Sequence, residues 1–337
     1  MLDPTTARRY GLGMTRGTQI PAAVLSCVLL AGCAGPTPNA GRRQDASRAG
    51  AAVAPEGGDG TNPTTASAAS GALPKFSRYR AMEIIRKLSV DIGVRVRTTS
   101  NETKGARYIA RRFEALGYDV RIQRFQVDGG KSRNVIATRP DAIRFPFVLG
   151  GHMDSVPDSP GANDNASGVA VVLEMARLVR DRRQGRFFKF VAFGSEEYGK
   201  NGRHHIGSEV MVNRMTDRGR RRTPGMLSVD MIADGRPLIA GYSGFASDVV
   251  ARDVYTKLKR AGIFMTFRVL CDCSDHGPFE RRGIPAAFLW SGDEPNYHDP
   301  SDVPGNLSRK DLVRTGRGVR AFVSSFRERL IRRYRRH

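Results

Sequence analysis

Continuous apolar segments that alternate with helical segments constrain the fold of this 337-residue chain most strongly. Apolar runs occupy residues 145–151, 186–194, 225–232 and 284–290, and such runs are typical of strands buried on both faces. Helical spacing of apolar residues separates them over 167–180 and 247–261. The alternation predicts an α/β fold, a three-layer sandwich with a mixed, mainly parallel central sheet.

The remaining folded segments agree with this class. We expect further helices over 78–89, 103–116, 275–282 and 310–330, and further strands over 119–127, 134–139 and 264–270. In open α/β sheets, ligands bind beyond the carboxyl ends of the parallel strands. The residues that follow the apolar runs are therefore the first candidates for a functional site.

Five possible metal ligands lie at or just beyond the ends of these runs: His152, Asp164, Glu197, Asp230 and His298. Two imidazoles and three carboxylates form a ligand set that suits zinc. Five ligands are more than one four-coordinate ion uses, but they suit two ions that share a carboxylate. The pattern predicts a hydrolase with two Zn²⁺ ions per chain.

Neighbouring residues supply further functional groups. Asp154 follows His152 by two positions, so its carboxylate can accept the second imidazole proton and fix the tautomer. Glu196 precedes Glu197, and in extended backbone the two side chains point in opposite directions. We therefore assign Glu197 to metal and Glu196 to general base and acid. Asp164 can bridge two cations through its two oxygens, or it can cap the helix that follows.

Tyr297 precedes His298, and its phenol is a candidate donor to the oxyanion of a tetrahedral intermediate. The alternative is an ordinary half-buried loop aromatic. We interpret His204, His205 and His337 as surface residues outside the site, because arginines surround them. His276 lies closer to the candidate site and has a supporting or structural role in this interpretation.

The N-terminal 73 residues differ in composition from the rest. Residues 21–33 form an apolar stretch after three arginines, too short to span a membrane and typical of a secretory signal. It ends in Leu-Ala-Gly-Cys, which resembles a bacterial lipobox and predicts lipidation of Cys33. We predict a lipoprotein-type signal peptide over 1–33, starting at Met1 or Met14, a disordered tether over 34–73 and a catalytic domain over 74–337. A plain cleaved signal peptide is the alternative. The expected location is the bacterial cell envelope, extracytoplasmic and lipid-anchored, or secreted if the lipobox is not used.

The formal net charge of +22 comes mostly from arginine. A basic chain can bind nucleic acid or an anionic membrane, but no nucleic-acid-binding motif is present, so no nucleic-acid partner is expected. We expect most arginines to be spread over the solvated surface. The C-terminal residues 327–337 follow an amphipathic helix and are rich in arginine, so they are a candidate contact with anionic lipid.

Only Cys271 and Cys273 lie outside the predicted signal peptide. One residue separates them, which makes a disulfide difficult, yet an oxidising compartment favours pairing. Both outcomes remain open from the sequence.

At this point the motifs resemble a known family. The segments GGHMDS, GANDNASG, FGSEEYG, SVDMI, SDHGPF and YHDPSD, from about Tyr79 to the C-terminus, resemble those of dizinc exopeptidases of the bacterial leucyl and Streptomyces aminopeptidase type, the twenty-eighth metallopeptidase family. The resemblance implies a zinc-exopeptidase-like fold, peptide substrates and two zinc ions. It implies that His152 and Asp230 hold one ion, that Glu197 and His298 hold the other, and that Asp164 bridges them. Glu196 would be the base and Asp154 the partner of His152.

The sequence departs from the family pattern in two places. Residues 201–206, NGRHHI, intervene before Gly207 and Ser208, so the substrate pocket is expected to differ. The tyrosine that some members carry between two cysteines is missing, since only Asp272 lies there. Glutaminyl cyclases share much of the motif set, but they use one zinc and carry tryptophan where this chain has Tyr297. A glutaminyl-peptide cyclotransferase, a carboxypeptidase and an inactive relative are the alternatives to an aminopeptidase.

Overall fold

The computed structural model describes residues 72–199 and 201–337. The predicted signal peptide, Cys33 and the predicted tether up to residue 71 lie outside the described residues. Leu73, which we assigned to the tether, is buried and packs in the main hydrophobic core. The packed core therefore includes at least one residue before the predicted start of the catalytic domain at residue 74. No helix of the described part has the length and hydropathy that crossing a membrane requires.

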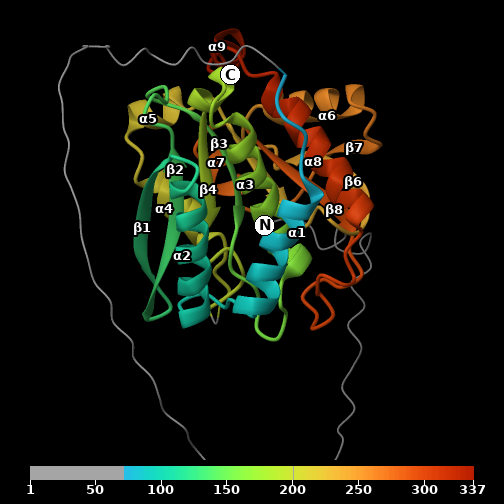
Figure 1. The fold of residues 1–337 in the computed structure, drawn as a ribbon. Coiled ribbons are helices and arrows are strands. Elements are labelled where there is room, and N and C mark those ends of the chain that lie inside the picture. The colour runs from blue at the N-terminus through green and yellow to red at the C-terminus, as the bar shows by residue number, and fades with distance from the viewer. Residues whose placement is uncertain (1–71, 200) are drawn as a thin grey trace, which may run out of the picture. The chain divides into compact units, whose positions relative to one another are not determined.

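An eight-stranded sheet forms the centre of the domain (Figure 1). Its strands in chain order are β1 (Asp119–Val127), β2 (Gly130–Thr138), β3 (Phe147–His152), β4 (Phe188–Phe193), β5 (Met226–Asp230), β6 (Arg236–Tyr242), β7 (Met265–Val269) and β8 (Ala286–Asp293). Their spatial order is β1-β2-β4-β3-β5-β8-β6-β7. The four central neighbours, β4, β3, β5 and β8, run parallel, while β1, β2 and β6 bring antiparallel pairings. The predicted mixed, mainly parallel sheet is confirmed.

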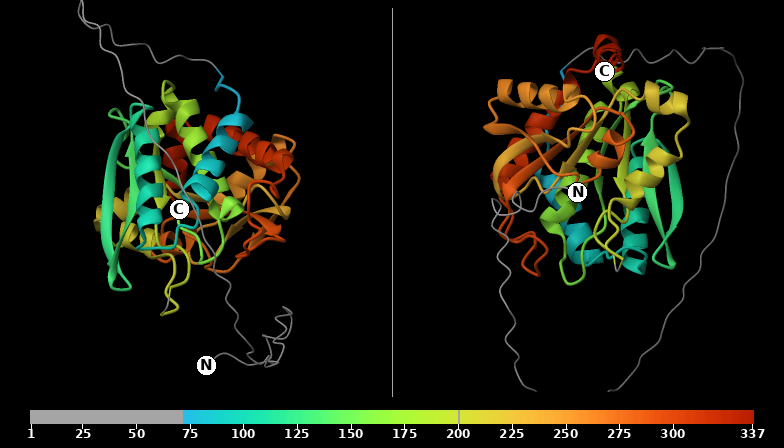
Figure 2. Two further views of the ribbon diagram at one scale, coloured as in Figure 1. Left: turned by 60° about the horizontal axis from the view of Figure 1, so that its bottom comes forward. Right: turned by 180° about the vertical axis from the view of Figure 1, so that it is seen from behind.

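Helices cover both faces of the sheet (Figures 1 and 2). The described helices are α1 (Arg78–Arg86), η2 (Lys87–Ile92), α2 (Ser100–Glu114), η3 (Ala162–Ser167), α3 (Gly168–Val179), η4 (Arg183–Phe187), α4 (Ile206–Asn213), α5 (Asp217–Arg222), α6 (Val249–Arg260), α7 (His276–Glu280), α8 (Arg309–Ser324) and α9 (Glu328–Tyr334). Helices α2 and α3 pack on one face of the sheet, and α1 packs against α3. Helices α4 and α7 pack together on the other face, seen from behind in Figure 2.

The alternation of side chains along the central strands divides the core between these two faces. In β3, Leu149 belongs to the larger cluster together with residues of α1, α2, α3 and α8, whereas Val148 belongs to a smaller cluster with Phe279 of α7. Every residue of β3 and β5 is buried. Each fully buried Leu, Val or Phe contributes about 1.5–3 kcal/mol of transfer free energy, so the central strands are a rigid base for the loops at their carboxyl ends.

The structure differs from the sequence prediction in three segments. The helix predicted over 310–330 is wrong as one element, because α8 ends at Ser324 and α9 starts at Glu328. The break lets Phe326 enter an aromatic cluster with Phe147 and Phe188. Strand β6 and helices α4 and α5 were not predicted, since Pro237 and several glycines and arginines hide their patterns.

Candidate metal centre

Neighbouring strands bring all five predicted ligands to one edge of the sheet. His152 is the last residue of β3 and Asp230 is the last residue of β5. Glu197 follows β4 by a short turn, and His298 lies in the loop after β8. Asp164 lies in η3, between β3 and α3, where the backbone departs from helical geometry. The parallel arrangement of β4, β3, β5 and β8 makes this convergence possible, because their carboxyl ends meet at the same edge.

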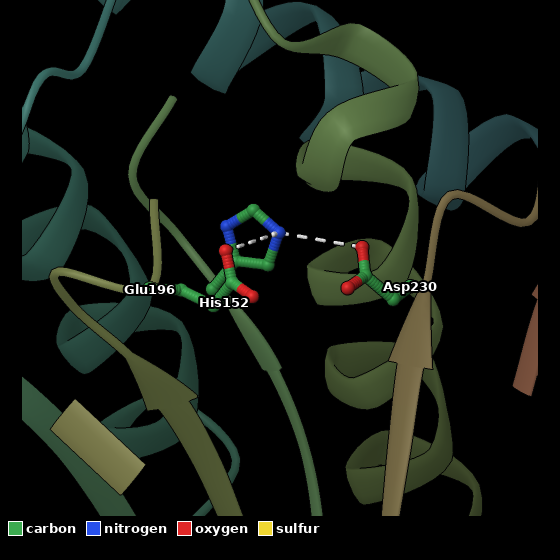
Figure 3. Close-up of side chains that lie close together, drawn as sticks. All are labelled: His152, Glu196 and Asp230. Carbon is green, nitrogen blue, oxygen red and sulfur yellow. Dashed lines mark ion pairs between the residues drawn. The ribbon is translucent and has the colours of Figure 1, made fainter. Parts of the chain in front are cut away.

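The imidazole of His152 faces three carboxylates, of which Figure 3 shows those of Glu196 and Asp230. Its Nε2 lies 3.1 Å from Oδ1 of Asp164, 3.3 Å from Oδ1 of Asp230 and 3.8 Å from Oε2 of Glu196. In Figure 3, Glu196 and Asp230 lie on opposite sides of the ring. Glu196 is the most distant of the three carboxylates from this nitrogen.

His298 completes the group on the other side of Asp164. Its Nε2 lies 3.3 Å from Oδ2 of Asp164 and 3.1 Å from Oε2 of Glu197. Asp164 therefore presents Oδ1 to one imidazole and Oδ2 to the other. A carboxylate with its two oxygens turned toward two separate ligand groups has the arrangement of a bridging ligand.

The site concentrates buried charge. Burial raises the pKa of Glu196 and of Glu197 well above the usual range, and for Glu197 the neighbouring Asp164 adds to the increase. Burial alone would lower the pKa of His152, but the surrounding carboxylates, with Asp230 foremost, raise it well above its usual value. The pKa of His298 rises to about 10, because hydrogen bonds to Asp164 and Glu197 outweigh its burial.

Among the five candidate ligands, two buried carboxylate oxygens have no hydrogen-bond partner: Oε1 of Glu197 and Oδ1 of Asp230. An unpaired buried charge is costly, and a cation is one way to compensate it. Two sets of three buried side chains bring one ligand atom each within 4.8 Å of the others: His152, Glu196 and Asp230, and His152, Asp164 and Glu197. The donor set and its unsatisfied oxygens fit divalent metal.

Asp302 holds the loop that carries Asp164. Its carboxylate accepts the backbone N–H of Asn163 at 2.6 Å and that of Asp164 at 3.0 Å, and its own carbonyl accepts the N–H of Ala162 at 3.2 Å. Burial raises the pKa of Asp302 to about 6. Sequence reasoning assigned no role to this residue, although it closes the YHDPSD segment. Only the tertiary structure brings it to Asp164.

Asp154 lies in the site but makes contacts different from those expected. The nearest acceptor to Nδ1 of His152 is the backbone carbonyl of Asp154 at 3.2 Å, while the carboxylate Oδ1 lies at 3.7 Å. That carboxylate accepts the backbone N–H groups of Glu196 and Glu197 at 3.1 and 3.2 Å. Asp154 therefore fixes the turn after β4 as well as the strand end of β3.

Asp230 and a buried arginine complete the supporting contacts. Oγ of Ser274 donates to Oδ2 of Asp230 at 2.8 Å, which leaves Oδ1 turned toward His152. Arg95 is fully buried, and its guanidinium donates to backbone carbonyls that include those of Met153 and Gly161, on both sides of the loop between β3 and η3. No local pattern in the sequence predicts that Arg95 is buried.

The interpretation of His205 as a surface residue was wrong. Its side chain is buried, and its Nε2 lies 2.9 Å from Oε1 of Glu196. His204 is half-buried and packs edge-on against the ring of His205. The flanking arginines suggested a solvated loop, but the chain turns back so that one of two adjacent histidines points inward.

The structure also places Tyr297, His276 and the two cysteines. Tyr297 is 51% exposed, and its ring stacks on His298 with centroids 3.7 Å apart. His276 is buried away from the ligands, where its Nε2 lies 2.8 Å from Oγ of Ser243. A disulfide joins Cys271 to Cys273, which resolves the alternatives that the sequence left open.

Known proteins share this sequence pattern and this fold. Aminopeptidase YwaD of Bacillus subtilis is 33% identical over 206 residues, which are 57% of this chain and 44% of that protein. The probable lipoprotein aminopeptidase LpqL of Mycobacterium tuberculosis is 30% identical over 226 residues, 56% of this chain and 44% of that protein. The chain thus spans less than half the length of these two curated relatives.

Solved structures show the same fold. The structure of BSAP, a zinc aminopeptidase from Bacillus subtilis, matches with a TM-score of 0.67 at 22% identity and covers 74% of this chain and 95% of that chain. A Bacteroides thetaiotaomicron glutaminyl cyclase matches with a TM-score of 0.64 at 22% identity, over 76% of this chain and 100% of that one. The model of peptidase family M28 matches residues 134–323, more than half of the chain, and these residues contain all five candidate ligands. The chain belongs to peptidase family M28.

Proposed function

We propose that this protein is a two-zinc aminopeptidase that removes N-terminal residues from peptides. The observation that carries the proposal is the orientation of Asp164, whose two oxygens face His152 and His298 at 3.1 and 3.3 Å. A site for one metal ion would not require a buried carboxylate whose two oxygens face two different imidazoles. Aminopeptidase relatives and membership of peptidase family M28 support the reaction class.

We assign one zinc to His152 and Asp230 and the other to Glu197 and His298, with Asp164 shared. Two distances favour this assignment over one in which Glu196 is a ligand. Glu196 lies 3.8 Å from Nε2 of His152, farther than Asp164 and Asp230, and its other oxygen is in contact with His205. Zinc bound here would supply Lewis acidity, lowering the pKa of a water and polarising a carbonyl.

Glu196 is the general base and acid in this proposal. It is buried beside the ligand group, with Oε2 3.8 Å from Nε2 of His152, so this oxygen can reach a water among the ligands. It accepts the proton of the attacking water and delivers it to the leaving amine. The carboxylate of Asp154 holds the backbone of Glu196 and Glu197 in place by accepting both of their N–H groups.

Tyr297 is the proposed donor to the oxyanion. Its ring stacks on His298 and is half-exposed, so it borders the side of the site from which substrate enters. A phenol hydrogen bond that strengthens as charge develops on the carbonyl oxygen lowers the barrier.

We further propose that the protein is extracytoplasmic in the bacterial cell envelope, with Cys33 lipidated. The LpqL relative is named as a probable lipoprotein aminopeptidase, and the apolar stretch that ends at Cys33 has the layout of a lipoprotein signal.

Hydrolysis of amino-acid anilides by the zinc-loaded full chain tests the proposed function. We expect cleavage of free-amino anilides and none of the N-acetylated analogues, because an aminopeptidase requires the free N-terminus. Glu196→Ala should lose activity by ~10²–10⁴-fold with zinc retained. Cleavage only at the C-terminus of blocked peptides would instead indicate a carboxypeptidase. Cyclisation of N-terminal glutamine without anilide cleavage would indicate the glutaminyl cyclase alternative.

A further inference from the structure

We propose that His205 is a positioning residue that fixes the orientation of the Glu196 carboxylate. This proposal rests on the proposed function, in which Glu196 is the general base. His205 lies at the end of the loop that joins the turn after β4 to helix α4, next to the first residue of that helix.

One side-chain contact and two backbone hydrogen bonds hold residues 205–206 against residues 195–196. Nε2 of His205 lies 2.9 Å from Oε1 of Glu196, and the backbone N–H of His205 donates to the carbonyl of Glu196 at 2.7 Å. The next residue, Ile206, donates to the carbonyl of Ser195 at 2.9 Å. Because the backbones are held at this spacing, the imidazole has little freedom to move away from the carboxylate.

The loop between these pairs is also fixed. Arg97 is buried, and its Nη1 donates to the carbonyl of Glu197 at 3.1 Å and to the carbonyl of Arg203 at 2.9 Å. An ion pair with Asp128 holds the same guanidinium. The guanidinium of Arg97 thus connects Glu197, at the start of the loop, to Arg203, which lies two residues before His205.

The contact determines which oxygen of Glu196 is available. Oε1 is engaged by His205, while Oε2 is turned toward His152 at 3.8 Å. A carboxylate held by one oxygen presents the other in a fixed direction, which is what a base needs to meet a water at a defined position. Without the imidazole, the side chain gains rotational freedom and the productive orientation becomes a minor population.

The variants His205→Ala and His205→Gln test this role in the zinc-loaded full chain. Loss of a residue that orients a group of the site typically costs about 10–100-fold. We expect His205→Ala to lower kcat by about that factor, with KM and bound zinc unchanged. His205→Gln can place an amide nitrogen near the position of Nε2, so it should recover most of the lost kcat. Arg203→Ala removes an exposed side chain of the same loop, which pairs with Glu209 and does not contact His205 or Glu196, and should leave kcat near the wild-type value.

A double-mutant cycle separates this proposal from the assignment of Glu196. If His205 acts through Glu196, His205→Ala should cost nothing further in a Glu196→Ala background. Wild-type kcat in His205→Ala would overturn the proposal, as would loss of zinc or an equally low kcat in His205→Gln. Full activity of Glu196→Ala would instead overturn the proposed function.

A second, independent observation concerns the opposite end of the domain. There we infer a surface that binds the headgroups of an anionic membrane. Helix α9 lies at this end, because Tyr334 contacts Phe147 at the start of β3, whereas the metal centre lies beyond its end (Figure 1). Nine arginines and one acidic residue, Glu328, line two adjoining cavities of about 820 and 310 Å³: Arg144, Arg183, Arg218, Arg222, Arg320, Arg327, Arg329, Arg332 and Arg335.

These arginines come from four separate parts of the chain, so the concentration of charge arises only on folding. Within residues 72–199 and 201–337, only Arg332 of the nine forms an ion pair, and five of the others also make no side-chain hydrogen bond: Arg144, Arg183, Arg218, Arg222 and Arg329. The chain also enters the domain here, because Arg320 donates to the carbonyls of Leu73 and Pro74. A lipid anchor at Cys33, as proposed above, would keep the domain close to the membrane and raise the effective concentration of lipid headgroups near these arginines, which favours lipid over a soluble polyanion.

Vesicle co-sedimentation of the full chain carrying Cys33→Ser, which cannot be lipidated, tests this surface. We expect low-salt binding to vesicles containing phosphatidylglycerol and none to pure phosphatidylcholine. Reversal of three exposed arginines that form no ion pair, Arg144→Glu, Arg183→Glu and Arg329→Glu, should weaken binding at least about tenfold. The matched control Arg107→Glu, Arg111→Glu and Arg121→Glu carries the same net charge change on α2 and β1 and should bind almost as well as the parent. Equal losses in both variants, or binding of a soluble polyanion without binding of vesicles, would overturn the inference.

Discussion

The carboxylate of Asp302 accepts the backbone N–H of Asp164 at 3.0 Å, although 138 residues separate the two in the chain. The contact joins the segment after β8 to the loop after β3, and the two segments contribute His298 and the proposed bridging ligand. The geometry of the metal centre therefore depends on a residue that is not itself a ligand.

Asp302→Ala should weaken zinc binding by about 10–100-fold, because the Asp164 loop loses the acceptor for two of its N–H groups. Zinc affinity measured by competition with a chromogenic chelator checks this expectation. Asp299→Asn is the matched control, since Asp299 is exposed and bonds only within its own turn. Equal affinity in wild type and Asp302→Ala would contradict the positioning role.

Replacing Arg95 should destabilise the whole domain. Its guanidinium donates to five backbone carbonyls, those of Leu88, Gly93, Met153, Pro160 and Gly161. Removing it takes this donor from all five carbonyls, of which only those of Leu88 and Gly161 also accept a backbone N–H within the described part of the chain, so we expect Arg95→Met to lower the free energy of unfolding by ~3 kcal/mol or more. Arg95→Lys should rescue little, because an ammonium has three donors and lacks the planar fork. Urea denaturation of the three proteins measures the effect, and a rescue by lysine would show that charge alone matters.

Glu102 should make stability depend on pH. Burial raises its pKa from 4.5 to about 7. Since the folded state binds this proton more tightly than the unfolded state does, the contribution of Glu102 to stability is greatest below about pH 4.5 and is lost as pH rises to about 7. The difference in pKa corresponds to at most ~3 kcal/mol. Glu102→Gln should remove this part of the pH dependence, as measured by unfolding between pH 5 and 8. An unchanged profile in the variant would contradict it.

Tyr297→Phe should lower kcat by about tenfold or more while KM changes little, because the phenol hydrogen bond strengthens only as the oxyanion forms. The substitution keeps the ring that stacks on His298. Steady-state kinetics on an anilide substrate checks the split between kcat and KM. Wild-type kcat would leave Tyr297 as an ordinary loop aromatic.

The sequence predicted that the five candidate ligands lie together, because most of them follow a strong local signal. The apolar runs that end at His152 and Asp230 mark buried parallel strands, and the topology of such sheets brings their carboxyl ends together. The elements with clear periodicity, such as β1 and α3, were predicted to within a residue or two of their observed bounds.

The contacts that orient the ligands were not predictable in this way. Arg95, Asp302 and His205 lie in polar segments that resemble exposed loops, and their burial results from long-range packing. The break after α8 was also hidden, because apolar residues continue at helical spacing from Phe322 to Leu330 while the backbone turns at Phe326. Tertiary contacts determine these features, and no local pattern encodes them.

The most direct test of the account is the number of zinc ions that the full chain binds as anilide hydrolysis appears. Apo-protein titrated with zinc should bind two ions per chain when activity is complete, and Glu196→Gln should bind two ions without hydrolysing the anilide. Saturation at one zinc per chain with full activity would contradict the bridging role of Asp164 and the two-zinc mechanism that depends on it.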